Sequence, residues 1–162
     1  TSMTLEQKNT CIMCRAKLVD DGSKEDIERF REWIKKGKAW AMCALAERYQ
    51  EGIGVKQSDK KAIEFYEMAA KRGNTTAQHN LGLYYQQGIR GVTKSNKRAI
   101  EYWTLAANQG HSGAQSNLGT MYASGDGVEQ SYSKAREWFT KAAAQGQENA
   151  IDGLKQLEKL GV

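Results

Sequence analysis

The sequence predicts an all-α protein, an α-solenoid of about three helix–turn–helix repeats with a capping helix at each end. Three observations predict this fold class. First, alanines recur at intervals of 36, 37 and 36 residues, at Ala41, Ala77, Ala114 and Ala150. Second, the residues that follow each alanine repeat in the same order. Third, the chain has 16 glycines and no proline, so glycine must mark the points where the chain reverses.

Each repeat is expected to begin with an amphipathic helix, helix A. A leucine follows each alanine after four residues, and a tyrosine follows that leucine after four more in the first three copies. The leucines are Leu45, Leu81, Leu118 and Leu154, and the tyrosines are Tyr49, Tyr85 and Tyr122. Side chains at this spacing lie on one face of an α-helix. One repeat alone cannot bury such an apolar stripe, so neighbouring repeats are expected to stack.

A second helix, helix B, is expected after a loop that contains glycine. The loop glycines are Gly52 and Gly54, Gly88 and Gly91, and Gly125 and Gly127. Ser58, Ser95 and Ser131 follow these loops, and serine is a favoured N-cap residue. Helix B is expected to stop at Gly73, Gly110 and Gly146. Glycine readily adopts the left-handed conformation that closes a helix.

The repeat period divides the chain into six segments. Gly37 lies 36 residues before Gly73, so the residues before it are expected to form a lone helix B. The last segment has the pattern of helix A with added polar residues, which suits a cap. The segments are a tail at 1–22, an N-terminal capping helix at 23–38, repeats at 39–74, 75–111 and 112–147, and a C-terminal capping helix at 148–162.

The pattern Ala-x-x-x-Leu-Gly-x-x-Tyr, which begins at Ala77 and again at Ala114, resembles the Sel-one-like repeat family, a relative of the tetratricopeptide repeat. The resemblance covers about residues 39–160. The first copy departs from the pattern, because Ala46 stands where the later copies have glycine. The resemblance implies a right-handed α-solenoid that serves as an adaptor or scaffold for protein complexes.

In tetratricopeptide-like stacks, helix A lines the inner groove. The groove-facing positions would be five and two residues before the helix-A leucine, and two, five and six residues after it. In the third repeat these positions are Gly113, Ser116, Thr120, Ala123 and Ser124. The residues predicted to bind a peptide or protein are Trp40, Cys43, Glu47, Thr76, His79, Asn80, Leu83, Gln86, Gln87, Ser116, Asn117 and Thr120.

Some of these residues have a second interpretation. Trp40 is the first candidate for an aromatic anchor, but it could instead pack on the preceding helix around Trp33. Asn80 and Asn117 could bond to the backbone of an extended peptide, as asparagines at this position do in some tetratricopeptide relatives. Alternatively, each asparagine could bond to a neighbouring helix.

Cys11 and Cys14 form a Cys-x-x-Cys half-site for zinc, because this spacing turns both thiolates towards one metal ion. The sequence offers no obvious second pair of ligands. The segment resembles the last cysteine pair of a RING-type zinc finger, with Ile12 in place of proline. The alternative is a tail with two free thiols. No cofactor is expected, and zinc is expected only in a longer form of the protein.

Composition narrows the functional classes. Three cysteines are too few for a disulfide framework, so a reducing compartment, cytoplasmic or nuclear, is expected. No apolar run approaches the ~20 residues of a membrane-spanning helix, and a membrane partner is not expected. Motifs such as Gly-x-Ser-x-Gly and His-Glu-x-x-His are missing. Neither an enzyme nor a small-molecule substrate is therefore expected.

Lys60, Lys61, Lys97 and Arg98 stand in the first turns of two expected B helices, where cations are mildly unfavourable. An acidic partner or a nucleic acid would explain this basic edge, and solvated helix ends would explain it more simply. Stacking aromatic residues are not interleaved with these cations, which weakens the nucleic-acid interpretation.

The sequence therefore predicts a protein–protein interaction scaffold that binds a peptide or partner protein in the groove of the helix-A face. One alternative is the substrate-recruiting part of a RING-type ubiquitin ligase. The other is nucleic-acid binding by the basic edge.

Overall fold

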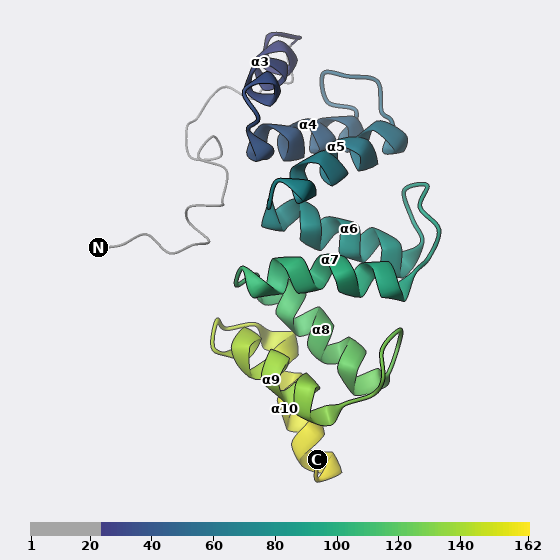
Figure 1. Cartoon of the computed structure of the whole chain (residues 1–162), viewed down its shortest axis with the longest axis vertical. Helices are drawn as coiled ribbons and strands as arrows, with labels where there is room; N and C mark the ends of the chain where they lie inside the picture. The colour runs from purple at the N-terminus through teal and green to yellow at the C-terminus, as the bar shows by residue number, and fades with distance from the viewer. Residues whose placement is uncertain (1–23) are drawn as a thin grey trace, which may run out of the picture.

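The computed structural model describes residues 24–162, where all regular secondary structure is α-helical. The helices are α3 (Lys24–Lys35), α4 (Ala39–Glu51), α5 (Asp59–Lys71), α6 (Thr75–Gln87), α7 (Asn96–Asn108), α8 (Ser112–Ser124), α9 (Tyr132–Ala143) and α10 (Glu148–Leu160). They stack in chain order along the long axis of the molecule (Figure 1). The predicted all-α repeat fold is confirmed.

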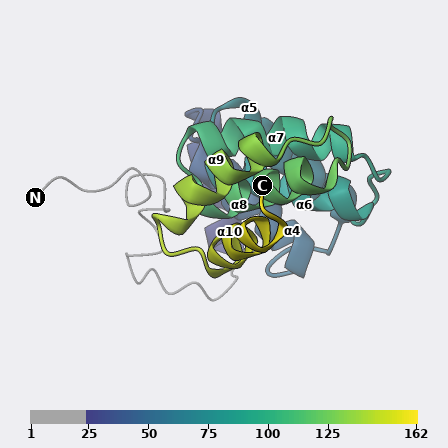
Figure 2. The same ribbon diagram turned by 90° about the horizontal axis from the view of Figure 1, so that it is seen from below.

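Two kinds of helix alternate along the stack. We call α4, α6, α8 and α10 the A helices, and α3, α5, α7 and α9 the B helices. Within a repeat, α4 packs against α5, α6 against α7, and α8 against α9, and each B helix also contacts the next A helix. Seen along the long axis, α5, α7 and α9 lie on one side and the A helices on the other (Figure 2).

The helix ends follow from local side-chain and backbone chemistry. Each serine predicted as an N-cap accepts a hydrogen bond from the backbone N–H three residues later: Ser58 from Lys61, Ser95 from Arg98, and Ser131 from Lys134. The glycines after the B helices, Gly73, Gly110 and Gly146, have left-handed φ angles of 82°, 91° and 82°. Both predicted signals are confirmed.

Two A helices also have side-chain caps, which the sequence analysis did not identify. Asn74 Oδ1 accepts from the Ala77 N–H at 2.8 Å, and His111 Nδ1 accepts from the Ala114 N–H at 3.2 Å. The two residues occupy equivalent positions in successive repeats. An imidazole nitrogen therefore caps α8 where an amide oxygen caps α6.

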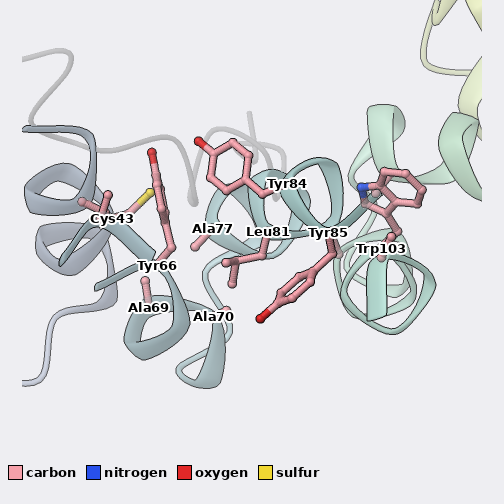
Figure 3. Close-up of a cluster of buried hydrophobic side chains, with 14 of the residues drawn as sticks. Cys43, Tyr66, Ala69, Ala70, Ala77, Leu81, Tyr84, Tyr85 and Trp103 are labelled. Atoms are coloured by element: carbon pink, nitrogen blue, oxygen red, sulfur yellow. The ribbon is translucent and has the colours of Figure 1, made fainter. Parts of the chain in front are cut away.

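Small residues on the A helices face large residues on the B helices. Gly82 lies so close to Trp103 that a Cβ at Gly82 would stand 2.2 Å from the indole Nε1. Likewise, a Cβ at Gly119 would stand 2.5 Å from the Phe139 ring. Figure 3 shows Trp103 packed beside the A-helix residues of the second repeat. Glycine at this position therefore allows a close approach of A and B helices, which explains its place in the repeat motif.

The buried apolar side chains form two clusters. The larger one extends from Ile27 of α3 to Met121 of α8. The smaller one joins α9 and α10 and includes Phe139, Ala150 and Leu157. The interior thus divides within the third repeat, between α8 and α9.

Candidate functional site

The predicted binding residues lie on the A helices α4, α6 and α8, and they differ in exposure. Glu47, Thr76, Gln87 and Thr120 are exposed, and Trp40, His79, Asn80, Leu83, Gln86 and Asn117 are partly buried. Cys43 and Ser116 are buried. They lie two residues before their leucines, where a short side chain is covered by its neighbours. Their place in the groove register stays a prediction, and burial leaves little of either side chain at the surface.

Trp40 packs on the preceding helix. Its ring centroid lies 5.7 Å from that of Trp33 and 6.5 Å from that of Phe30, both on α3. This is the second of the two interpretations given above. Because the side chain remains partly exposed, Trp40 joins α3 to the first repeat and keeps one part of its ring at the surface.

A polar network connects the first and second repeats. The Tyr66 and Tyr84 hydroxyls both donate to the Gln50 amide oxygen, Tyr66 at 3.3 Å. Burial raises the pKa of both phenols above the ordinary value of 10.0, so both stay protonated as donors. Figure 3 shows Tyr66 and Tyr84 directed towards the same side of the stack. The side chain of Gln50 is thereby fixed.

A histidine pair connects the second and third repeats, and the sequence analysis did not foresee it. The rings of His79 and His111 stack with centroids 4.4 Å apart and planes 22° apart. Asn117 Nδ2 lies 3.5 Å from His79 Nε2, so this asparagine contacts the neighbouring helix. Burial, and next the repulsion of His111, lower the pKa of His79 to about 4. His79 is therefore neutral at pH 7.

A groove of about 560 Å³ lies between the A helices α8 and α10. The side chains that line it are Thr120, Ala123, Ser124, Tyr132, Phe139, Asn149, Asp152, Gly153, Gln156, Leu157 and Leu160. Hydroxyl, amide and carboxylate groups surround a floor that contains Phe139 and Leu157, both buried. Leu160, at 65% exposure, is the most exposed apolar side chain at the rim.

The groove lies nearer the C-terminal end of the stack than most of the predicted binding residues. Of that set, only Thr120 lines it. Its residues on α10 nevertheless follow the predicted register. Asn149, Asp152 and Gln156 stand five before, two before and two after Leu154. Applying the helix-A rule to the C-terminal helix would have found them, but that helix was interpreted as a cap.

Other expectations concern metal ions and membranes. Cys11 and Cys14, on which the zinc half-site and the ubiquitin-ligase alternative depend, lie outside the described residues. Within residues 24–162, no three His, Cys, Asp or Glu side chains are grouped so that they could hold a metal ion. Over the same range, every helix is too short or too polar to cross a bilayer.

Comparisons with known proteins agree with this architecture. A sequence model of the Sel1 repeat matches residues 41–74, 75–111 and 112–147. The structure of a Sel1 repeat protein from Oxalobacter formigenes is 37% identical with a TM-score of 0.77, and the match covers 81% of this chain and 98% of that one. The comparison with curated proteins gave no match.

Two further solved structures are similar. The protective antigen c5321 of uropathogenic Escherichia coli, described as having an SLR fold, is 35% identical with a TM-score of 0.78. That match covers 84% of this chain and 29% of the antigen. Cysteine-rich protein B of Helicobacter pylori is 22% identical with a TM-score of 0.59, over 76% of this chain and 93% of that one. The last likeness concerns the fold alone.

Proposed function

The chain belongs to the Sel1 repeat family, whose members are generally protein-interaction scaffolds, and on that premise we propose that its A-helix groove binds a peptide segment of a partner protein. The family is typically non-catalytic, and the proposal needs no catalytic group or cofactor. Protein is the partner class, and the groove between α8 and α10 is the binding site.

The groove between α8 and α10 is the observation that carries this proposal. Its volume of about 560 Å³ is within the ordinary range for ligand sites. The amides of Asn149 and Gln156 can donate to and accept from a peptide backbone. The hydroxyls of Thr120 and Ser124 already donate to backbone carbonyls of α8, so they can accept from the peptide. The floor around Phe139 and Leu157 suits one apolar side chain of the partner.

The remaining predicted residues extend the proposed surface towards the N-terminus. Thr76 and Gln87 are exposed on α6, and Asn80 and Gln86 are partly exposed there. We propose that a partner longer than the groove continues over α6 to Glu47 and the exposed part of Trp40. A reducing compartment remains part of the proposal, because three cysteines are too few for a disulfide framework.

The proposal is tested by filling the groove. A double variant, Thr120→Arg with Gln156→Arg, places two long cations at exposed groove positions. The matched control, Thr140→Arg with Asn108→Arg, places the same side chains at exposed positions on α9 and α7. Both variants should fold, because exposed substitutions change stability little. Each is used beside the unmodified chain to capture partners, which are identified by mass spectrometry.

We expect partners that the control retains and the groove-filled variant loses. A direct titration of one such partner should show an affinity at least about tenfold weaker for the groove-filled variant. Equal capture by both variants would mean that the groove is not the binding surface, whatever the family role of the chain.

A further inference from the structure

The loops between A and B helices form a continuous edge along the stack. The loops of the second and third repeats each contact the first turn of the B helix in the preceding repeat. Arg90, in the α6–α7 loop, makes an ion pair with Asp59 of α5 at 3.2 Å. In the next repeat, a Cβ at Gly127 would stand 2.7 Å from the Cβ of Asn96 at the start of α7. Residues of successive loops and B-helix starts are therefore neighbours.

Two isoleucines are exposed on this edge. Ile53 and Ile89 each follow the glycine that ends an A helix, and each is 41% exposed. They occupy equivalent positions in the first and second repeats. The third repeat has Asp126 at that position, so the repeat itself does not require an apolar residue there. Exposed isoleucine at this position is a property of two repeats only.

The same edge carries exposed lysines. Lys56 and Lys60 lie in the first repeat, and Lys94 and Lys97 in the second, all exposed. In the third repeat, Glu129, Gln130 and Ser133 occupy the positions of Lys56, Lys94 and Lys60. The first two repeats thus combine cations with apolar side chains, whereas the third is acidic and polar.

Other cations of the edge are already bound within the protein. Lys61 Nζ lies 5.0 Å from the centroid of the Tyr49 ring, and the Arg98 guanidinium lies 4.8 Å from that of Tyr85. Arg98 also donates to the Tyr85 hydroxyl at 2.7 Å. These contacts stabilise cations at helix N-termini, where the helix dipole opposes them.

Aromatic rings lie beneath two cations of the basic edge. Tyr49 and Tyr85 are buried under their cations and stack on Phe65 and Tyr102. Because the tyrosine rings are covered, they cannot stack on the bases of a nucleic acid.

We propose that this edge, which we call the loop edge and define as Ile53, Lys56, Lys60, Ile89, Lys94 and Lys97, is a second docking surface for an acidic segment of a partner protein that carries apolar side chains. The lysines complement carboxylates, and the isoleucines complement apolar side chains at the spacing of one repeat. A phosphate backbone offers no apolar surface to the isoleucines. Two partly exposed isoleucines also supply little of the apolar area that a bilayer surface would bury.

The test selects peptides from a random library displayed on phage, with the full chain immobilised. Two variants interrupt the loop edge with polar residues. The lysine variant is Lys60→Ser with Lys97→Ser, which introduces the residue found at Ser133. The isoleucine variant is Ile53→Asn with Ile89→Asn, which introduces side chains of the size of Asp126 without its charge. We expect both variants to fold, because the third repeat has polar residues at the equivalent positions.

Each variant has a matched control elsewhere on the surface. Lys35→Ser with Lys71→Ser removes the same charge from the last turns of α3 and α5. Met68→Gln with Leu105→Gln removes two apolar side chains that are 36% and 50% exposed on B helices.

We expect selected peptides rich in Asp or Glu and in Leu, Ile or Phe. Their affinity should fall about tenfold in each loop-edge variant and stay unchanged in the controls. Binding should also weaken as salt is added. Peptides that bind both loop-edge variants as well as the unmodified chain would overturn the proposal. The proposal would also be overturned if no acidic peptide is selected and the chain instead binds a labelled oligonucleotide or phosphatidylserine vesicles, with that binding lost in the lysine variant alone.

Discussion

His79 and His111 decide how the junction between the second and third repeats responds to acid. Both rings are held in place: His111 caps α8 through Nδ1, and His79 lies against it and against Asn117. Gly113 leaves space for this arrangement, since a Cβ there would lie 3.2 Å from His79 Nε2. A proton on His79 would place a cation in a partly buried site beside another imidazole.

The first prediction concerns stability in acid. The pKa of His79 falls from 6.5 in the unfolded chain to about 4 in the folded one. Between these values the unfolded chain binds the proton and the folded chain does not, so acid favours unfolding. The loss of stability should be absent above about pH 6.5 and complete below about pH 4. The loss should be on the order of 3 kcal/mol. Denaturant unfolding at a series of pH values measures it.

Two variants isolate the histidine from the carboxylates that titrate nearby. His79→Gln should flatten the unfolding free energy between about pH 4 and 6.5 relative to the unmodified chain. His111→Asn should keep the cap of α8, as Asn74 does for α6. It should also remove the repulsion between the two imidazoles, and with it part of the pH dependence of the unfolding free energy. If the unfolding free energy of His79→Gln depends on pH as steeply as that of the unmodified chain, His79 is not the group responsible.

Single residues were the least predictable part of the site. Trp40 has two plausible uses in the sequence, and only the position of α3 shows that it packs on Trp33. Cys43 and Ser116 stand at groove positions of the repeat but are buried. The position of a residue in the repeat predicts the face of the helix on which it lies, but not how far neighbouring side chains cover it. The contact between His79 and His111 depends on how two repeats pack, and no local pattern encodes it.

At the scale of helices, one pair of positions controls how closely A and B helices approach. The pairs are Ala46 with Tyr66, Gly82 with Trp103, and Gly119 with Phe139, at equivalent positions in the three repeats. The two glycines leave no room for a Cβ. The first repeat combines alanine with tyrosine instead, so its departure from the family motif involves both members of the pair.

The second prediction follows from this pairing. Gly82→Ala should destabilise the protein by about 1–3 kcal/mol, because the new methyl group would overlap the Trp103 indole. Adding Trp103→Tyr to this variant reproduces the pair of the first repeat and should recover part of the loss. Thermal unfolding of the single and double variants measures both effects. A single variant as stable as the unmodified chain would show that the helices move apart freely.

The helices themselves could be predicted because their signals are local. A serine that caps a B helix and a glycine that ends it act within four residues of the chain. The groove was not found because the last helix was interpreted as a cap, and because α8, α9 and α10 form the groove only when they pack together. The ion pair between Arg90 and Asp59 was also hidden, since it joins residues that only the stacking of repeats brings together.

At the scale of the whole molecule, the division of the interior into two clusters has a consequence for local stability. The cluster of α9 and α10 contains few buried residues, whereas the other extends over six helices, from α3 to α8. In a stacked array each repeat is stabilised only by its neighbours. The end with the smaller cluster should therefore open more often than the middle.

The third prediction is a gradient of hydrogen exchange. Backbone amides of α9 and α10 should exchange faster than those of α5, α6 and α7, as measured by mass spectrometry on peptide fragments. Gly153→Ala should increase the difference, because a Cβ there would stand 2.7 Å from the Phe139 ring. It should leave α5 and α6 unchanged. Uniform exchange along the stack would instead indicate one cooperative unit.

The contact of each loop with the preceding B helix bears on how such proteins change in length. A tandem duplication of one period of 36 or 37 residues would carry both halves of this contact, the loop and the helix start that receives it. The new junction would bring together the two halves of one repeat: after duplication of the second repeat, Arg90 would lie against Asn96 and not against Asp59. Arrays of this kind can therefore gain or lose units while the geometry of each boundary is kept and the residues that meet there change.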